Sequence, residues 1–420
     1  MLPKKKIGRK FFVWGIILFP LLMALYIVSV NSNTLINETV SYILLFGSSF
    51  SFVMLVTGII FYLTGKDKLK RKFRKPLVAL FALFATVYTV VGFGAVYELY
   101  FSGKEFKEWL ITTAMTTMSH QYLATWFYND YDVNVVLANN SVIETAEDTN
   151  ADLIEFTVPD FDKVSYANEY EKEVLTKDPG NDLYKIIDIQ EKNFKGKLAV
   201  IYDPSKVKVG ISKGVSTSTS LSNTYGQYIT QIASNYNAVL AINGGGFYDP
   251  DWNSTGGVPF GVTISEGKLI ANNVKAGVGG GIIGFNKDNK LVLARMTAQE
   301  ALNAGIRDCV DFGPFLIVNG KSSYVNGNGG WGQAPRSAIG QRADGIVLLL
   351  AIDGRQTGSI GADMGDLTRV MLNYGAINAA NLDGGTSSSM ELNGQTITNP
   401  RNGGFQAKTR PVPTAFIVVK

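Results

Sequence analysis

The sequence predicts an α+β fold in which three N-terminal transmembrane helices precede a mixed, strand-rich α+β domain outside the cytoplasm. Two observations indicate this division. The first hundred residues contain three uncharged apolar runs, and beyond residue 196 short alternating or apolar runs follow one another between Gly, Asn and Asp residues. Runs of ~20 apolar residues can cross a bilayer as helices, and short alternating runs bounded by turn residues are typical of strands. The predicted domains are an anchor at 1–100, a connecting region at 101–196 and a folded domain at 197–420.

The predicted anchor consists of apolar runs from Phe11 to Val30, from Ser41 to Leu63 and from Leu77 to Tyr97. Lys and Arg residues cluster before the first run and between the second and third, whereas the loop between the first two has neither. Basic loops stay on the cytoplasmic side, so the N-terminus is expected inside and everything after the third crossing outside. A buried soluble helical core would need polar faces at helical spacing, which these runs lack. The sequence therefore predicts a multi-pass protein of the cell membrane, with the lipid bilayer as a partner.

The scarcity of Cys and His excludes several kinds of site. Cys309 and His120 are the single residues of their types. One cysteine allows no intrachain disulfide, and one histidine lying before the folded domain excludes both a Ser-His-Asp triad and a multi-histidine metal site within it. The basic clusters flank the apolar runs, where they act as topology signals, so we expect no nucleic-acid partner.

The connecting region has two parts of different composition. Residues 104–128 carry apolar residues at mixed helical spacing, which predicts an amphipathic segment on a membrane or on the domain. Residues 129–195 are rich in Asp and Glu with short apolar clusters, which predicts an acidic stalk or a small subdomain.

Strand-like patterns dominate the region after residue 196. The runs KLAVIYD and KVKVGIS alternate and are separated by Asp-Pro-Ser, which predicts a hairpin, and residues 238–242 (AVLAI) form an uninterrupted apolar run typical of a buried strand. Helices are predicted at 223–236, 298–304 and 366–374. Further strands are predicted in GVTIS, GKLIA, GIIGF, KLVLARM, FLIVNG, GIVLLLAID, AINAANLD, SMELNG and TAFIVV.

Polar residues recur where these apolar strands begin or end. They are Asn243, Arg336, Asp353 with Arg355, Asn381 with Asp383, and Arg410. Each Asp-Gly or Asn-Gly-Gly taken alone is explained by turn chemistry, because Asn, Asp and Gly tolerate positive φ. Their repetition, together with the arginines, favours one shared carboxylate-and-guanidinium site.

These motifs resemble the phosphodiester glycosidase family, which includes the uncovering enzyme N-acetylglucosamine-1-phosphodiester α-N-acetylglucosaminidase. The resemblance covers about the last half of the chain and implies a bacterial membrane-anchored member of the family. Thr386 stands where the family often has another Gly, and Asp366 where a Glu is common. The motifs that carry the resemblance are NGGGF (243–247), GVPFG (257–261), RSAIG (336–340), DGR (353–355), NLDGGTSS (381–388) and RPV (410–412).

The resemblance implies cleavage of a sugar from a phosphodiester, and the residues present suit that chemistry. A phosphate monoester leaves readily, so a site without histidine is sufficient, but the phosphate needs positive charge and the reaction needs a carboxylate. The predicted catalytic residues are Asp383 as base or nucleophile, Asp353 as its partner, and Arg336, which together with Arg410 would bind phosphate. The predicted substrate-binding residues are Asn243, Gly244, Arg355, Asn381, Gly384, Gly385, Thr386, Ser387 and Arg410, with the amides of Gly384 and Gly385 as an oxyanion cradle and Phe247, Tyr248, Trp252 and Trp331 as aromatic residues able to stack on sugar.

The sequence leaves several alternatives open. No cofactor is required, although a divalent cation, calcium or magnesium, is compatible with oxygen ligands from Asp353, Asp363, Asp366 and Asp383. The expected substrate is a glycan or glycosyl phosphodiester of a surface polysaccharide or glycopolymer. The competing functions are a non-catalytic glycan-binding or exopolysaccharide assembly module with the same fold, and a phosphodiesterase that cuts the P–O bond. The pattern does not fix the oligomeric state.

Overall fold

The computed structural model divides the chain into two compact units, Met1–Ala138 and Asn139–Lys420. This boundary differs from the boundaries predicted after residues 100 and 196. Each unit is described by itself below. The structure describes residues 4–31, 38–63, 87, 91–92, 94, 99, 104–117, 120–156, 165–215, 224–249, 254–273, 280–402 and 406–420.

The N-terminal unit is helical. Its first two helices pack closely where glycines remove side-chain bulk, since a Cβ atom at Gly58 would lie 2.5 Å from the Cα atom of Phe12. The rings of Phe19 and Phe52 meet in the same interface, with centroids 5.3 Å apart. The later, shorter helices share a small core that includes Ile111 and Tyr128. The described helices are α1 (Lys4–Asn31), α2 (Glu38–Leu63), α4 (Lys104–Met115), α5 (Tyr122–Thr125) and α6 (Asp130–Asn139).

The structure contradicts the expectation of three transmembrane helices. Among the described residues, no helix combines the length and the apolarity needed to cross a membrane. Most of the third predicted span lies outside the described residues. The predicted multi-pass localisation depended on the three spans and is contradicted with them.

The C-terminal unit contains a seven-stranded sheet that we call the β14 sheet. Its strand order is β12-β11-β16-β14-β15-β3-β2, and all its pairings are antiparallel. The strands are β2 (Tyr184–Gln190), β3 (Lys195–Ile201), β11 (Phe315–Val318), β12 (Lys321–Ser322), β14 (Arg336–Arg342), β15 (Val347–Ile352) and β16 (Ala376–Leu382).

A second sheet, the β5 sheet, has the order β18-β17-β5-β19-β4 and is also antiparallel. Its strand β4 overturns the predicted hairpin, because β3 belongs to the β14 sheet and β4 to this one. The Asp-Pro-Ser segment between them forms a 3-10 turn, η2 (Pro204–Lys206), capped by the Asp203 side chain, and this turn sends the chain from one sheet to the other. The strands are β4 (Val207–Ile211), β5 (Ala238–Asn243), β17 (Met390–Leu392), β18 (Gln395–Thr396) and β19 (Thr414–Val419).

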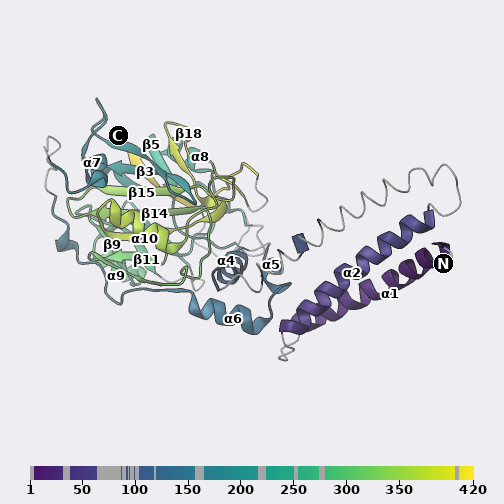
Figure 1. Ribbon diagram of the computed structural model, residues 1–420. Helices are drawn as coiled ribbons and strands as arrows, with labels where there is room; N and C mark the ends of the chain where they lie inside the picture. The colour runs from purple at the N-terminus through teal and green to yellow at the C-terminus, as the bar shows by residue number, and fades with distance from the viewer. Residues whose placement is uncertain are drawn as a thin grey trace. The chain divides into compact units, whose positions relative to one another are not determined.

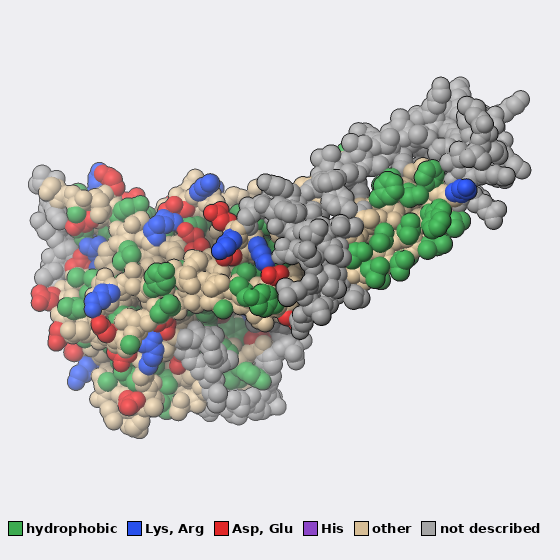
Figure 2. Space-filling model, turned by 60° about the horizontal axis from the view of Figure 1, so that its bottom comes forward, with side chains coloured by type: hydrophobic (Ala, Val, Ile, Leu, Met, Phe, Trp, Pro, Cys, Tyr) green, Lys and Arg blue, Asp and Glu red, His purple; other side chains and the backbone are tan. Residues whose placement is uncertain are grey.

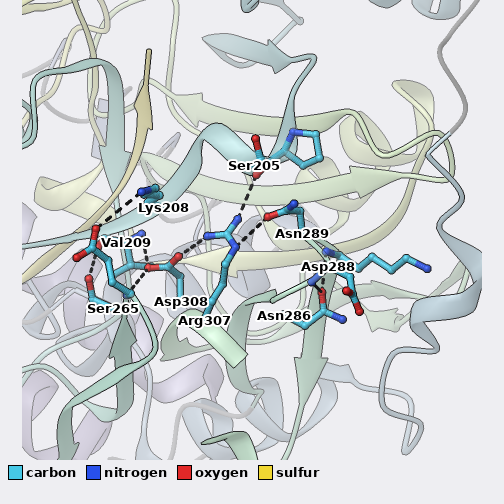
Figure 3. Close-up of polar contacts among 12 residues, drawn as sticks. Ser205, Lys208, Val209, Ser265, Asn286, Asp288, Asn289, Arg307 and Asp308 are labelled. Atoms are coloured by element: carbon cyan, nitrogen blue, oxygen red, sulfur yellow. Dashed lines mark hydrogen bonds and ion pairs between the residues drawn. The ribbon is translucent and has the colours of Figure 1, made fainter. Parts of the chain in front are cut away.

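The third sheet, the β10 sheet, is joined to the β5 sheet by a buried carboxylate. Asp308 of β10 accepts hydrogen bonds from the backbone amides of Val209 (3.2 Å) and Glu266 (3.1 Å) and pairs with Arg307. Arg307 in turn donates to the Asn289 side chain at 3.0 Å, as Figure 3 shows. The strand order is β7-β6-β10-β8-β9, with β6 (Gly261–Ser265), β7 (Lys268–Asn273), β8 (Gly281–Asn286), β9 (Leu291–Ala294) and β10 (Ile306–Phe312).

The three sheets surround one apolar core, and helices cover their outer faces (Figure 1). Alternation along β3 illustrates this, because Ala199 and Ile201 face the shared core while Leu198 and Val200 face outward. The prediction of a mixed, strand-rich α+β domain is therefore confirmed. The covering helices are α10 (Met364–Asn373) and α7 (Glu169–Leu175) on the β14 sheet, α8 (Ile229–Asn235) on the β5 sheet and α9 (Ala298–Asn303) on the β10 sheet.

Residues 139–156, which we call the strap, run along the C-terminal unit and are held by its backbone. Strand β1 (Ser141–Ile143) pairs with β13 (Tyr324–Asn326). The Glu144 carboxylate accepts the amides of Phe315 (2.5 Å) and Gly280 (3.0 Å) and pairs with Arg295 at 2.6 Å. The strap ends in a 3-10 turn, η1 (Ala151–Leu153). This part of the predicted stalk is thus integrated into the folded unit.

Charged side chains are interspersed on the face of the C-terminal unit that Figure 2 shows. Red and blue side chains alternate over its described surface there. The surface ion pairs Lys321–Glu147 and Arg369–Glu191 are examples of this mixing.

Candidate active site

The register of the β14 sheet brings three of the predicted polar segments to one edge. Strand β14 runs antiparallel to both neighbours, so its first residue, Arg336, lies opposite Ile352 at the end of β15, and Ser337 lies opposite Leu382 at the end of β16. Asp353 and Asp383 follow these two strand ends directly. The sheet therefore places the start of RSAIG beside DGR and NLDGG.

Asn243 joins this edge to the β5 sheet. Its Nδ2 donates to the carbonyl of Asp383 at 2.6 Å, and its Oδ1 accepts from the hydroxyl of Ser337 (2.7 Å) and the amide of Ser389 (3.2 Å). The amide of Asp383 also donates to the carbonyl of Gly244 at 3.1 Å. Asn243 is fully buried and bonded within the protein, so in this conformation the predicted binding residues Asn243 and Gly244 fix the Asp383 backbone between the sheets.

Asp383 has a carboxyl group suited to proton transfer. Burial raises its pKa to about 6, and the neighbouring Asp249 carboxylate acts in the same direction. The Ser387 side chain, the charge of Arg410 and the amide of Gly384, which donates to Oδ1 at 3.0 Å, oppose this increase. A carboxyl group with this pKa is largely ionised at neutral pH yet accepts a proton readily, as a general base must.

Asp249 is a site residue that the sequence analysis did not single out. Its Oδ2 accepts a hydrogen bond from Nη1 of Arg410 at 2.6 Å, and its Oδ1 accepts the amide of Ser254 at 3.0 Å. The guanidinium of Arg410 lies 4.7 Å from the ring centre of Phe247. Arg410 therefore has a carboxylate partner within the protein, and Asp249 adds a second carboxylate beside Asp383.

Arg336 is buried, and three backbone carbonyls hold its guanidinium. Nε donates to Ala362 at 3.2 Å, and Nη2 donates to Gly332 at 2.7 Å and to Trp331. The remaining nitrogen, Nη1, would lie 3.5 Å from a Cβ atom placed on Gly384. Burial, together with the positive charge of Arg355, lowers the pKa of Arg336 to about 10, while Asp363 and Asp383 oppose this decrease.

Arg355 approaches the same backbone from the neighbouring turn. Its Nη1 donates to the Thr386 hydroxyl (3.2 Å) and the Arg401 carbonyl (3.3 Å), while Nη2 would lie 3.2 Å from a Cβ atom on Gly385. Burial lowers the pKa of Arg355. The absence of side chains at 384 and 385 thus lets two guanidinium groups face adjacent backbone positions.

Within the described part of the chain, Arg336 and Arg355 are buried or half-buried cations without a carboxylate inside 4.0 Å. Burying an uncompensated charge is costly, and here two like charges repel each other as well. A site that tolerates this arrangement is prepared for an anionic ligand, for which the bidentate guanidinium of Arg is well suited.

Two predicted site residues, Asp353 and Asn381, contact the backbone around the arginines rather than the arginines themselves. The Asp353 carboxylate accepts the amide of Asn399 at 2.7 Å, and burial raises its pKa, which Asn399 and the charges of Lys197 and Arg401 oppose. Asp353 therefore anchors the segment whose Arg401 carbonyl holds Arg355. The Nδ2 of Asn381 donates to the Gly313 carbonyl at 2.8 Å, and its buried Oδ1 has no partner among the described residues.

The predicted oxyanion cradle is occupied by the protein itself in this conformation. The amide of Gly384 donates to Asp383, and that of Gly385 donates to the Pro335 carbonyl at 2.8 Å. Thr386 and Ser387 lie beside Arg355 and Asp383, respectively. Among the predicted aromatic residues, Trp331 lies 5.8 Å below Arg336, Tyr248 is exposed, and Trp252 lies outside the described residues.

No group of three or more Cys, His, Asp or Glu side chains suited to a metal ion occurs among the described residues. Of the four carboxylates considered as calcium or magnesium ligands, Asp363 caps α10 by accepting the amide of Asp366 at 2.9 Å, and the Asp366 side chain pairs with Arg369.

A three-sheet scaffold that presents carboxylates beside arginines, without histidine, is the kind of site expected for a hydrolase of anionic sugar esters. Residues 236–419 match the sequence model of the phosphodiester glycosidase family. This stretch is therefore similar to phosphodiester glycosidase domains, and the match supports the expectation of a hydrolase.

Individual relatives agree with the family match. The chain is 31% identical over 195 residues to the SPbeta prophage-derived uncharacterized protein YomE of Bacillus subtilis, covering 44% of this chain and 29% of the relative. It is 24% identical over 179 residues to mouse N-acetylglucosamine-1-phosphodiester alpha-N-acetylglucosaminidase, covering 38% of this chain and 33% of that enzyme. The chain thus spans about a third of the length of these curated relatives.

Among solved structures, the catalytic domain of the zebrafish enzyme of the same name, auto-inhibited by its pro-peptide, aligns with a TM-score of 0.48 at 22% identity. The alignment covers 58% of this chain and 86% of that one.

Proposed function

We propose that this chain is a glycosidase that hydrolyses a sugar-phosphodiester linkage in a polysaccharide or glycopolymer. The observation that carries the proposal is the pair of guanidinium groups, Arg336 and Arg355, which have no carboxylate within 4.0 Å among the described residues and face the Gly384–Gly385 backbone beside Asp383. Such a pair suits a phosphate group that carries one negative charge in the diester and gains further charge as it leaves.

The arginine that assists Arg336 differs in this proposal from the one inferred from the sequence. Arg410 was expected to bind phosphate, but its guanidinium pairs with Asp249. The Nη2 of Arg355 faces Gly385, next to Gly384, which Nη1 of Arg336 faces. We assign the phosphate to Arg336 and Arg355, and we assign to Arg410 the separate role of linking the Asp249 and Asp383 carboxylates.

The proposed reaction breaks the bond between the anomeric carbon and the phosphate oxygen. A water oxygen bonds to the anomeric carbon, the electron pair of the broken bond stays on the phosphate, and the proton lost by the water passes to Asp383. A phosphomonoester and a free sugar are the products. The charge on the leaving group grows during this step, so the two arginines stabilise the transition state more than the ground state.

The test uses the full-length protein and synthetic sugar-1-phosphodiesters of several sugars, with hydrolysis in water labelled with oxygen-18. The proposal requires release of sugar and phosphomonoester with the label in the sugar, and loss of turnover in Asp383→Asn. Label in the phosphate would identify P–O cleavage instead. No turnover of any of the sugars, together with retained glycan binding in Asp383→Asn, would indicate a non-catalytic binding module.

A further inference from the structure

The loop that holds Arg336 is rich in glycine. Residues 327–332 include four glycines with positive φ, at 327, 329, 330 and 332. The carbonyls at the end of this loop, from Trp331 and Gly332, accept the two hydrogen bonds of Arg336 Nη2. A glycine-rich segment loses much conformational entropy when it is ordered. The Trp331 side chain packs on the apolar core, and contacts from elsewhere in the chain must help to fix the remaining backbone of the loop.

Asn140 of the strap provides that support. It is buried, and its Oδ1 accepts the amide of Asn328 at 2.9 Å. The loop also fits closely around it, because a Cβ atom on Gly327 would collide with the Asn140 side chain and one on Gly330 with the Asn140 carbonyl. Strand β1 follows at once and pairs with β13, which leads into the loop.

We propose that Asn140 is a positioning residue for the active site: it holds the 327–332 loop so that the loop carbonyls orient Arg336 toward the bound phosphate. Two contacts joined by the loop carry the inference: the Asn328 amide donates to Asn140, and the Gly332 carbonyl at the other end of the loop accepts from Arg336. The orientation that results leaves Nη1 beside Gly384. The inference rests on the proposed function for the role of Arg336, and its test reads phosphate binding separately from turnover.

The experiment measures the Kd of inorganic phosphate by calorimetry, and kcat and KM for a sugar-1-phosphodiester, in the full-length chain. In Asn140→Ala we expect the Kd and KM to rise about tenfold, equal to about 1.4 kcal/mol, because Nη1 is no longer aimed at the anion. Asn140→Asp keeps an oxygen that accepts the Asn328 amide, so its Kd and KM should stay within about threefold of the wild type. Asn150→Ala is the control, because Asn150 lies on the same strap and accepts the amide of Asp152 instead.

A double-mutant cycle separates positioning from general destabilisation. If Asn140 acts through Arg336, Asn140→Ala should change the phosphate Kd by less than about twofold in an Arg336→Lys background, whereas independent effects would multiply. Should Asn140→Ala fail to fold, Gly330→Ala displaces the loop from the other side and must weaken phosphate binding in the same way.

The outcomes are distinct. An unchanged phosphate Kd in Asn140→Ala, or multiplicative effects in the cycle, would overturn the positioning role, as would a wild-type protein that does not bind phosphate. The wild type could bind phosphate, and the double-mutant cycle could show coupling between Asn140 and Arg336, while no sugar phosphodiester is hydrolysed. That result would leave the positioning role intact and refute the proposed function.

Discussion

Arg355 reaches the site from a strained backbone position. Its φ is +58°, in the left-handed region that non-glycine residues rarely adopt and that costs of order 1–3 kcal/mol. This conformation lets one side chain bond Thr386 and the Arg401 carbonyl while Nη2 faces Gly385. Arg355→Lys keeps the charge but loses the planar fork, so we expect the Kd of inorganic phosphate to rise about tenfold. Isothermal titration calorimetry measures the change.

Arg369→Lys is the matched control for this prediction. Arg369 lies exposed on α10, where it pairs with Glu191 and Asp366, and its replacement should leave phosphate binding unchanged. Equal affinity in wild type and Arg355→Lys would show that Arg355 does not bind the anion.

The Asp249 carboxylate should set the pH at which Asp383 ionises. Asp249 raises the pKa of Asp383, which lies at about 6, and Arg410 lowers it. Asp249→Asn removes the repulsion and releases Arg410 from its ion pair, and both changes favour ionised Asp383. The acidic limb of the kcat/KM profile, expected near pH 6 in the wild type, should therefore move to lower pH by about half a unit or more.

The same pH profile in Asp344→Asn provides the comparison. Asp344 pairs with Arg342 in a separate ion pair, so its removal should not move the acidic limb. An unshifted limb in Asp249→Asn would mean that Asp249 has no electrostatic role in the reaction.

Several site residues could be predicted from the sequence because they stand where apolar strands begin or end. Arg336, Arg355, Asp383 and Arg410 were named in this way, and the structure places them in one neighbourhood. Asp249 was missed because it stands before a proline, where an Asp also serves as a turn residue. The pairing of arginines with carboxylates could not be predicted either, since it depends on which side chains converge from different sheets.

At the scale of elements, apolar strands were predicted more reliably than strands with buried charges. The run at 238–242 was predicted and became β5, whereas β10 was not, because its sequence IRDCVDF contains Arg307, Asp308 and Asp311. The burial of Asp308 is possible because backbone amides and an ion pair with Arg307 satisfy its carboxylate (Figure 3). Such compensation comes from neighbouring strands and leaves no signal in the strand's own sequence.

Strand β17 carries a buried carboxyl group whose ionisation should destabilise the fold. Glu391 is fully buried, its Oε2 has no partner among the described residues, and burial raises its pKa, which the Gly394 amide opposes. A raised pKa means that the native state binds the proton more tightly than the unfolded state. Stability from this group is present at low pH and is lost as pH rises above the ordinary glutamate value.

Glu391→Gln removes this titration, so its melting temperature should exceed that of the wild type by a margin that grows between pH 4 and pH 8. We expect a gain of about 2–4 °C at pH 8, corresponding to about 1 kcal/mol for a domain of this size. Differential scanning calorimetry at several pH values measures it. Glu147→Gln, at an exposed ion pair with Lys321, should show no such growth, and a pH-independent margin in Glu391→Gln would refute the assignment.

At the scale of the whole molecule, composition predicts a domain boundary after residue 196, whereas residues Asn139–Lys420 form one compact unit in the structure. The acidic region after residue 129 looked like a stalk, yet the strap pairs with β13 and binds the amides of Phe315 and Gly280 through Glu144. The carboxylate of Glu144 accepts these backbone amides and pairs with Arg295. Sequence alone could not separate a solvated carboxylate from one that serves as an acceptor.

This arrangement predicts how fragments of the chain will behave. A fragment of residues 139–420 keeps the strap and all three sheets, so it should unfold cooperatively on heating. A fragment of residues 197–420 loses β2 and the first residues of β3, which lies between β2 and β15, and it exposes an apolar strand edge. We expect the shorter fragment to aggregate or to lack a cooperative transition in calorimetry and near-ultraviolet circular dichroism. A cooperative transition in residues 197–420 at the temperature of residues 139–420 would show that the strap and β2 are dispensable, and that the composition-based boundary had marked the folded unit after all.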